Sequence, residues 1–256
     1  MLRQQLIKKE VAGGTFRWRS HEISRIEGLS DAVFGFAITL LVVSLEVPKT
    51  FNELLEAMQG FGAFAICFML LFIVWYNQYK FFRRYGLQDT ITVVLNGALL
   101  FVVLFYVYPL KFLFTGLVDR FTGGHGQVRL PNGNLEAMIE AGQVSKLMFI
   151  FSAGYLAVFS VFVLLYLHAY RKRDELELST LELFDTVSSV KENLLHCSIA
   201  IVSIVFILIG GPQMTAFAGM IYMLTGVVMT IHGLGTRRRR KSLEKTIAAT
   251  PELESI

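Results

Sequence analysis

The stretch RIEGLSDAVFGFAITLLVVSL, residues 25–45, decides the fold class, because a charged opening runs directly into an apolar segment. Ala32 to Leu45 is a run of fourteen residues without a charge. Arg25 and Asp31 stand at its mouth, where each would cost roughly 2.5–3.5 kcal/mol at the bilayer centre and less near the interface. Charges of this cost are usually partnered and often mark an ion or substrate path. We therefore interpret the segment as a transmembrane helix with a functional or structural motif at its entrance.

The rest of the composition is that of an integral membrane protein. Hydrophobic residues make up 54% of the 256 residues and charged residues only 17%, whereas soluble domains carry about 25% charged residues. A spanning helix needs about 20 apolar residues, and four further uncharged runs reach that length: 57–79, 90–110, 147–170 and 193–236. The last run is broken by Gly-Gly-Pro at 210–212, which favours two helices joined by a tight turn. The sequence predicts an all-α, polytopic protein with six transmembrane helices.

The basic residues orient these helices. If both termini are cytoplasmic, 19 of the 24 Lys and Arg residues fall on the cytoplasmic side, as the positive-inside rule requires. The formal charge of +4 then reflects topology and favours no nucleic-acid partner. We expect three regions: a cytoplasmic N-terminal tail (1–24), a six-helix transmembrane domain (25–236) and a basic cytoplasmic C-terminal tail (237–256).

Three segments outside the apolar runs carry separate expectations. Arg171 to Lys191 alternates acidic and apolar residues, which is typical of an amphipathic helix or a helix extension. Leu135 to Ala141, in a loop with turn residues, is expected to form a short helix. The cluster Arg237 to Lys241 is open to two interpretations, a stop-transfer anchor or a lipid-binding patch. Cys67 and Cys197 fall inside predicted spans and are expected to be buried free thiols.

The sequence contains no recognisable catalytic motif. Walker, dinucleotide-binding, zincin and serine-hydrolase patterns are missing, and the five histidines lack the spacing of a metal site. We therefore expect no enzyme activity, no cofactor and no bound metal. The potassium-filter sequence TVGYG is also absent. What remains is a face of the first helix, formed by residues three and four apart: Phe36, Thr39, Leu40, Val43 and Val47. Periodicity alone leaves this face open to a lipid-facing or packing role.

Two blocks of residues resemble a known family. The first is Arg25 with Ser30 and Asp31, in the pattern Arg-x-x-x-Phe-Ser-Asp, with Leu29 in place of phenylalanine. The second spans the next two helices, with Gln78 where histidine is common, and consists of Trp75, Phe82, Arg83, Asp89, Asn96 and Pro109. Together these blocks, over roughly residues 25 to 110, are similar to the transmembrane protein 175 family of lysosomal-type potassium channels and their bacterial relatives.

The resemblance implies a mechanism. A chain with one six-helix repeat resembles the bacterial homotetramers, in which helix 1 lines a central pore for transiently bound potassium ions. It implies an apolar constriction at Phe36, where the family more often has isoleucine or leucine. One turn further, Thr39 would supply a hydroxyl layer, and Leu40 and Val43 further apolar pore positions. Arg25, Ser30 and Asp31 are expected to brace the base of helix 1, and the candidates for the adjoining polar network are Trp75, Asp89 and Asn96.

The resulting hypothesis is a potassium-selective, homotetrameric cation channel of a bacterial inner (plasma) membrane, with membrane lipids as its surroundings. The alternative is a secondary cation or proton-coupled transporter. Transporters usually show inverted repeats and helices broken near the midplane, and the one Gly-Pro break here lies between two full-length runs. A non-conducting scaffold would leave Thr39 and the charged motif unexplained.

Overall fold

A computed structural model describes residues 16–20, 22–43, 49–51, 54–55, 58, 60–121, 127–129, 135–140 and 142–249. Within them, five helices dominate: α2 (Arg25–Val43), α4 (Phe61–Tyr85), α5 (Thr90–Phe121), α6 (Val144–Arg171) and α7 (Thr180–Ala249). α7 is two helices in sequence, because Gly211 takes the non-helical angles φ 57° and ψ −153°, which glycine tolerates best. The predicted break at residues 210–212 is therefore confirmed, and the described residues of this all-α fold form six long helices.

Five of these helical stretches are long and apolar enough to cross a membrane: Phe61–Tyr85, Thr90–Arg120, Val144–Arg171, Thr180–Gly211 and Gln213–Ile247. α2, with 19 residues, completes the six but begins with three charges in its first seven residues. The helices run beyond the uncharged sequence on which their prediction rested. The predicted extension before residue 193 is helical from Thr180, and the basic C-terminal segment continues the last helix as far as Ala249.

The loop between α5 and α6 corrects one expectation. Leu135 to Ala141 was expected to be helical, but Leu135–Ala137 is a strand, β2, paired antiparallel with β1 (Gln127–Arg129). The pairs are Gln127 with Ala137, Val128 with Glu136 and Arg129 with Leu135. Three residues are too few to show the two-residue periodicity of a strand in the sequence.

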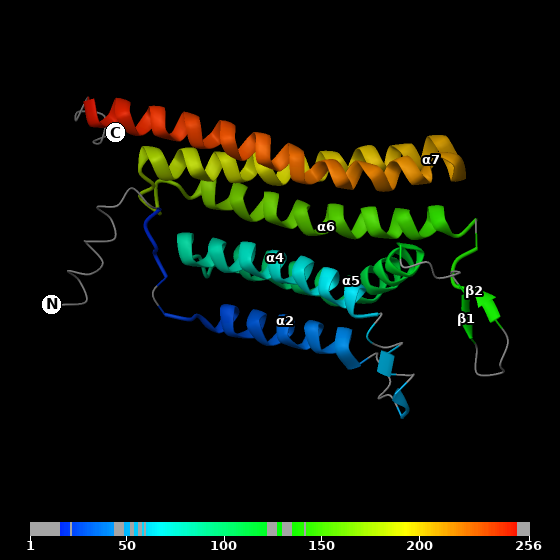
Figure 1. Cartoon of the computed structure of the whole chain (residues 1–256). Helices are drawn as coiled ribbons and strands as arrows, with labels where there is room; N and C mark the ends of the chain where they lie inside the picture. The colour runs from blue at the N-terminus through cyan, green and yellow to red at the C-terminus, as the bar shows by residue number, and fades with distance from the viewer. Residues whose placement is uncertain are drawn as a thin grey trace.

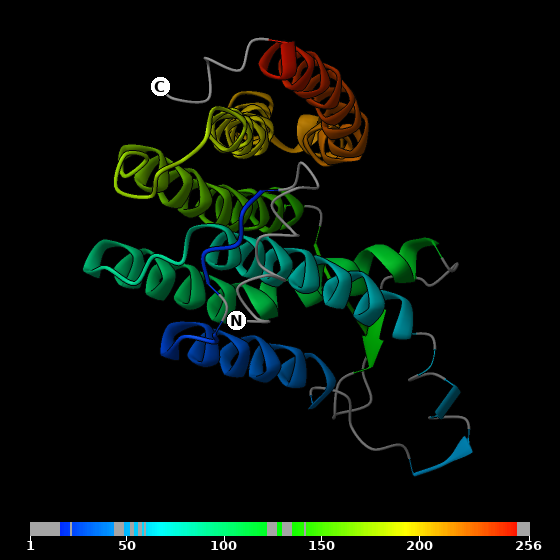
Figure 2. The ribbon, with the colours of Figure 1, turned by 90° about the vertical axis from the view of Figure 1, so that its left-hand side faces the viewer.

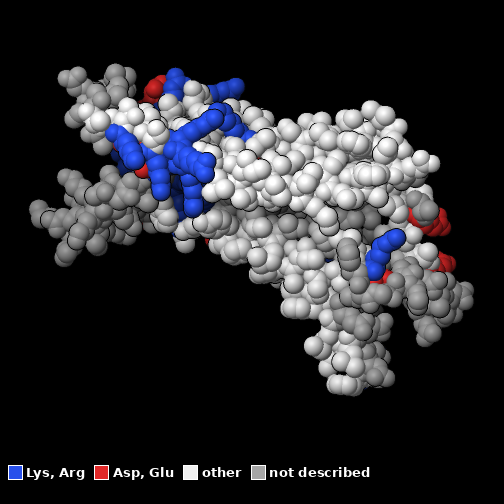
Figure 3. Space-filling view, turned by 45° about the horizontal axis from the view of Figure 1, so that its top comes forward, with Lys and Arg blue, Asp and Glu red and all other residues white. Residues whose placement is uncertain are grey.

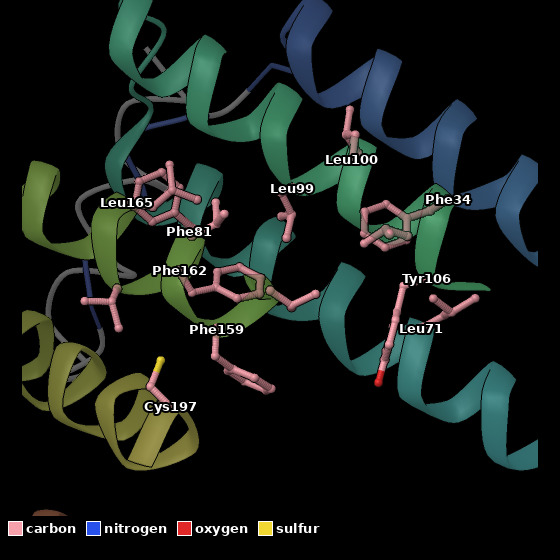
Figure 4. Packing of buried hydrophobic residues seen from close by; sticks show 14 of the residues in the cluster. Phe34, Leu71, Phe81, Leu99, Leu100, Tyr106, Phe159, Phe162, Leu165 and Cys197 are labelled. Carbon is pink, nitrogen blue, oxygen red and sulfur yellow. The ribbon is translucent and has the colours of Figure 1, made fainter. Parts of the chain in front are cut away.

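The helices lie in layers, with α2 on one side, α4 and α5 in the middle, and α6 and then α7 on the other side (Figures 1 and 2). α2 contacts α4 and α5, whereas α7 packs mainly on α6 and also meets α4 through a 2.8 Å hydrogen bond between Tyr85 Oη and Thr186 Oγ1. The centre is filled by aromatic and branched side chains of α4, α5 and α6, including Phe81, Leu99, Phe162 and Leu165 (Figure 4). α2 and α7 therefore form opposite outer layers of the chain.

A glycine sets the approach of α5 to α6. A Cβ atom at Gly154 would lie 2.1 Å from Cε2 of Tyr106. The same tyrosine donates a 2.6 Å hydrogen bond to the Phe151 carbonyl oxygen, so its ring is fixed in place. Only a residue without a side chain fits beside this ring.

An extended segment before α2, Phe16–Ser20, crosses the end of the bundle where α4 ends and α7 begins. Its backbone N–H at Arg19 bonds the Arg83 carbonyl oxygen at 3.0 Å. The Arg19 guanidinium donates to both carboxylate oxygens of Glu182, at 3.1 and 2.7 Å. Phe16 is buried with its ring edge-on to Tyr85, 5.4 Å between centroids. The segment therefore ties the start of α2 to two other parts of the chain.

Candidate functional site

One face of α2 is uncovered. Phe36 is 58% and Leu29 61% exposed, and Arg25, Ala32 and Thr39 are exposed on the same side. With about 100° per residue, these positions fall within a stripe about 80° wide. Leu40, at the edge of this stripe, is half-buried. Val43 ends α2, and its side chain lies outside the described part of the chain, so its orientation stays a prediction.

The opposite face of α2 is buried on α4 and α5. Phe34, Ala37 and Leu41 are at most 2% exposed and belong to the core. The Leu41 carbonyl oxygen also accepts a 2.7 Å hydrogen bond from Lys111 Nζ of α5. This bond satisfies one of the carbonyls that the end of a helix leaves without an intrahelical partner. The helix that carries the uncovered face is thus held in place by its buried face, which packs on α4 and α5.

Thr39 is the hydroxyl in the uncovered stripe. It donates a 2.9 Å hydrogen bond to the Gly35 carbonyl oxygen of its own helix. The proton therefore points back into α2, and the oxygen retains lone pairs to accept from or coordinate another group. Four such oxygens facing a common axis could interact with a cation, whereas a single one could not surround it.

A buried chain of hydrogen bonds connects three helices beneath the stripe. Asn96 of α5 donates to Ser30 of α2 at 3.0 Å and accepts from Gln78 of α4 at 2.6 Å. The Ser30 hydroxyl in turn donates a hydrogen bond to the Ile26 carbonyl oxygen at 2.8 Å. All three side chains are at most 2% exposed. Because unpaired buried polar groups are costly, this satisfied network fixes one arrangement of α2, α4 and α5.

Asp31 has a separate partner on α4. Trp75 donates its indole N–H to Asp31 Oδ1 at 2.7 Å. A short bond to a charged acceptor is stronger than a neutral one. The carboxylate of the motif is therefore held by an aromatic side chain 44 positions away in sequence. Arg25, in contrast, is exposed and forms no ion pair or side-chain hydrogen bond within the described residues.

Asp89 does not join either contact. It lies just before α5 and accepts from Thr92 Oγ1 at 2.6 Å and interacts with His168 Nε2 of α6 at 2.8 Å. Burial raises the pKa of this carboxyl, but the bonds from Thr92 and His168 outweigh it and hold the pKa below its usual range. A depressed pKa in the folded state adds stability above the unfolded pKa, and this stability is lost as the pH falls through the folded value. Asp89 thus fixes α5 to α6.

Two further structural signals are visible in the sequence but were not used in its interpretation. Ser24 and Glu27 form a capping box at the start of α2, with bonds of 2.7 and 3.2 Å. Ser179 and Glu182 repeat it at the start of α7, at 3.1 and 3.3 Å. The Ser-x-x-Glu spacing predicts both helix starts. The contact of Glu182 with Arg19 has no comparable signal, because 163 positions separate the two.

These features define a polytopic α-helical membrane protein. One face of its helix α2 is held on α4 and α5 by buried packing and hydrogen bonds, and the opposite face is uncovered. The profile of the family described as endosomal/lysosomal potassium channel TMEM175 matches residues 25–106, which include the first block of the predicted resemblance and all of the second except Pro109. A potassium channel of Marivirga tractuosa is 40% identical over 231 residues, covering 89% of this chain and 93% of the relative. The chain belongs to the TMEM175 family.

Solved structures agree with this assignment. The crystal structure of a threonine-to-alanine variant of the potassium channel MtTMEM175, in complex with a nanobody–MBP fusion protein, matches with a TM-score of 0.75 and 40% identity. That match covers 88% of this chain and 97% of the other. A lysosomal potassium-selective channel TMEM175 homologue from Chamaesiphon minutus has a TM-score of 0.53 and 22% identity, and supports the fold alone.

Proposed function

We propose that four copies of this chain form a potassium-selective cation channel, with the uncovered face of α2 from each copy lining a central pore. The observation that carries the proposal is that face itself. It combines Arg25 at the entrance, a threonine hydroxyl in the middle and Phe36 between them. A face turned to lipid gains nothing from an arginine or a hydroxyl, whereas a pore-lining face can use both. Relatives that are named potassium channels support the same proposal.

Closed symmetry supplies what one helix lacks. One α2 cannot surround an ion, but copies related by rotation place the same side chain in a ring. Phe36 rings would form the narrowest apolar constriction and oppose ion flow by excluding water. Thr39 rings would offer hydroxyl oxygens to a partly dehydrated ion. Potassium loses its water more readily than sodium, so such a layer favours potassium without a TVGYG filter. Leu40 and Val43 complete the apolar lining.

The charged motif acts on structure in this proposal. Ser30, Asp31, Trp75 and Asn96 hold α2 against α4 and α5, and so keep the pore face in place. Asp89 anchors the neighbouring end of α5 to α6. Arg25 lies on the pore side of α2, and in the tetramer it is expected to meet groups that belong to another copy of the chain.

The proposed setting is the inner (plasma) membrane of a bacterium, with both termini in the cytoplasm. The only permeant species in the proposal is the potassium ion, and the surroundings are membrane lipids. Lys and Arg gather at one end of the helices, and an uncharged band separates them from the other end (Figure 3). Such an asymmetry is typical of a positive-inside orientation.

Purified protein in planar bilayers tests the proposal. Under a potassium/sodium gradient, we expect unitary current steps and a reversal potential displaced toward that of potassium. Mass measurement of the same preparation should give four chains of 28.9 kDa. Saturable flux without current steps would instead indicate a transporter, and a monomer with unitary currents would contradict the shared pore.

A further inference from the structure

The part of α7 that follows the break at Gly211 carries an exposed stripe. This stripe is apolar at first and basic further along the helix. Leu224, Val227, Ile231 and Leu234 are all more than half exposed. At about 100° per residue, Arg238, Lys241 and Lys245 continue the same stripe along the same face of the helix, within an arc of about 100°. All three cations are exposed. The apolar stripe and the basic stripe are therefore one continuous surface.

The orientation of this helix is fixed from its other side. Arg240 is two positions from Arg238, and so points to the opposite side of the helix. Its Nε lies 3.1 Å from both carboxylate oxygens of Asp185, in the part of α7 before Gly211. Its guanidinium also contacts Glu244. Glu244 is therefore turned to the same inward side of the helix as Arg240. Within the described residues, Arg238, Lys241 and Lys245 form no ion pair with the protein.

The length of the helix places these cations at the edge of the bilayer. Gln213–Ile247 has 35 residues, which at about 1.5 Å per residue spans about 52 Å, against about 30 Å of hydrocarbon. The helix therefore emerges from the apolar layer near Leu234 and continues through the headgroups. Basic side chains gather at this end of the molecule (Figure 3). α7 is also the outer layer opposite α2. If α2 lines a central pore, α7 therefore faces lipid.

We propose that Arg238, Lys241 and Lys245 bind the phosphate groups of anionic phospholipids in the cytoplasmic leaflet. This inference rests on the proposed orientation and on the central position of α2, and not on conduction. Long basic side chains reach from an apolar surface to headgroup phosphates. Each Lys or Arg near an anionic surface contributes about 1 kcal/mol, which is about fivefold in affinity. Diffuse attraction of the whole basic end of the protein would not depend on this stripe in particular.

Native mass spectrometry of the purified full chain tests the site. Phosphatidylglycerol or phosphatidylcholine is added to the detergent-solubilised protein, and the dissociation constant of the bound lipid is measured. We expect tighter binding of phosphatidylglycerol to the wild type. The double variant Arg238→Gln/Lys241→Gln should lose on the order of thirtyfold, about fivefold for each cation. The matched control is Arg120→Gln/Lys146→Gln. It removes two exposed cations near the end of α5 and the start of α6, at the end of the bundle away from the basic stripe, and it should bind like the wild type.

Three results would overturn the site. The first is unchanged phosphatidylglycerol binding in the Arg238→Gln/Lys241→Gln protein, and the second is an equal loss in the control. The third is full displacement of the lipid by inorganic phosphate at equal concentration, which would assign the stripe to a soluble anion. Arg238→Lys/Lys241→Arg keeps both charges, so retained binding supports recognition by charge. A loss as large as in the neutral variant would assign the effect to packing and contradict the proposal.

Discussion

Phe36 and Thr39 are successive exposed positions on one stripe of α2, and each is argued to control a different property of the proposed pore. The phenyl ring of Phe36 is apolar and large, so it opposes the passage of water. The Thr39 hydroxyl donates its hydrogen bond to the Gly35 carbonyl oxygen, and its oxygen keeps lone pairs that can accept from or coordinate another group. The size of the barrier and the ion preference are therefore expected to change independently when the two residues are replaced.

Phe36→Ala should widen the constriction and raise the unitary conductance. The reason is that a methyl group leaves room for water where the phenyl ring excludes it. Single-channel recording in planar bilayers measures the change, and size-exclusion chromatography verifies that the variant assembles like the wild type. An assembled variant with unaltered conductance would remove Phe36 from the constriction.

Thr39→Val should lower the preference for potassium over sodium. Valine keeps nearly the shape of threonine and removes the oxygen. The expected loss is up to about tenfold, because a few tenths to about 1.4 kcal/mol covers this range. The reversal potential under a potassium/sodium gradient gives the ratio. If it equals that of the wild type, selectivity belongs to the apolar ring and not to the hydroxyl.

Asp31→Ala should reduce assembly of the protein, since it leaves the Trp75 indole N–H without its acceptor. Loss of a partner from a charge-assisted bond costs about 1.5–3 kcal/mol. Asp31→Asn is the matched control, because its amide oxygen can still accept from Trp75. The yield of the proposed tetramer and its thermal midpoint measure the effect. An alanine variant that assembles and melts normally but changes ion preference would place Asp31 in the ion path.

At the level of the elements, sequence pattern locates the helices better than it locates their ends or contacts. The uncharged runs mark each apolar span, yet α5 continues to Phe121 and α7 to Ala249, because helical hydrogen bonding does not stop at the apolar boundary. The family resemblance pointed to Asn96 and Trp75, but only packing shows that Asn96 meets Ser30 and Trp75 meets Asp31. The strands at 127–129 and 135–137 are too short to predict from periodicity.

Gly154→Ala should destabilise the pairing of α5 and α6. The added methyl group would lie 2.1 Å from a Tyr106 ring carbon, and overpacking of this kind costs about 1–3 kcal/mol. Gly226→Ala is the control, since a Cβ there meets nothing within 4 Å. Thermal unfolding in detergent compares the two. Equal midpoints for both variants would mean that the Tyr106 ring moves aside without cost.

For the molecule as a whole, hydropathy and basic-residue counts are sufficient to predict six helices, because the bilayer requires long apolar helices with satisfied backbones. The same counts do not reveal which helix is uncovered. That depends on the layering, in which α2 packs on α4 and α5 alone among the described helices. Only this layering shows which polar side chains of α2 are buried, as Ser30 is, and which are exposed, as Thr39 is.

Thiol modification of single cysteines on α2 tests most directly whether its uncovered face lines the ion path. Thr39→Cys puts a thiol on that face, whereas Ala37→Cys puts one on the fully buried opposite face. The native Cys67 and Cys197 are buried, so the wild type serves as the background. We expect a charged thiol reagent to reduce the unitary current of Thr39→Cys and to leave Ala37→Cys and the wild type unaffected. Current through Thr39→Cys that is insensitive to the reagent, or equal sensitivity of Ala37→Cys, would contradict a pore lined by this face.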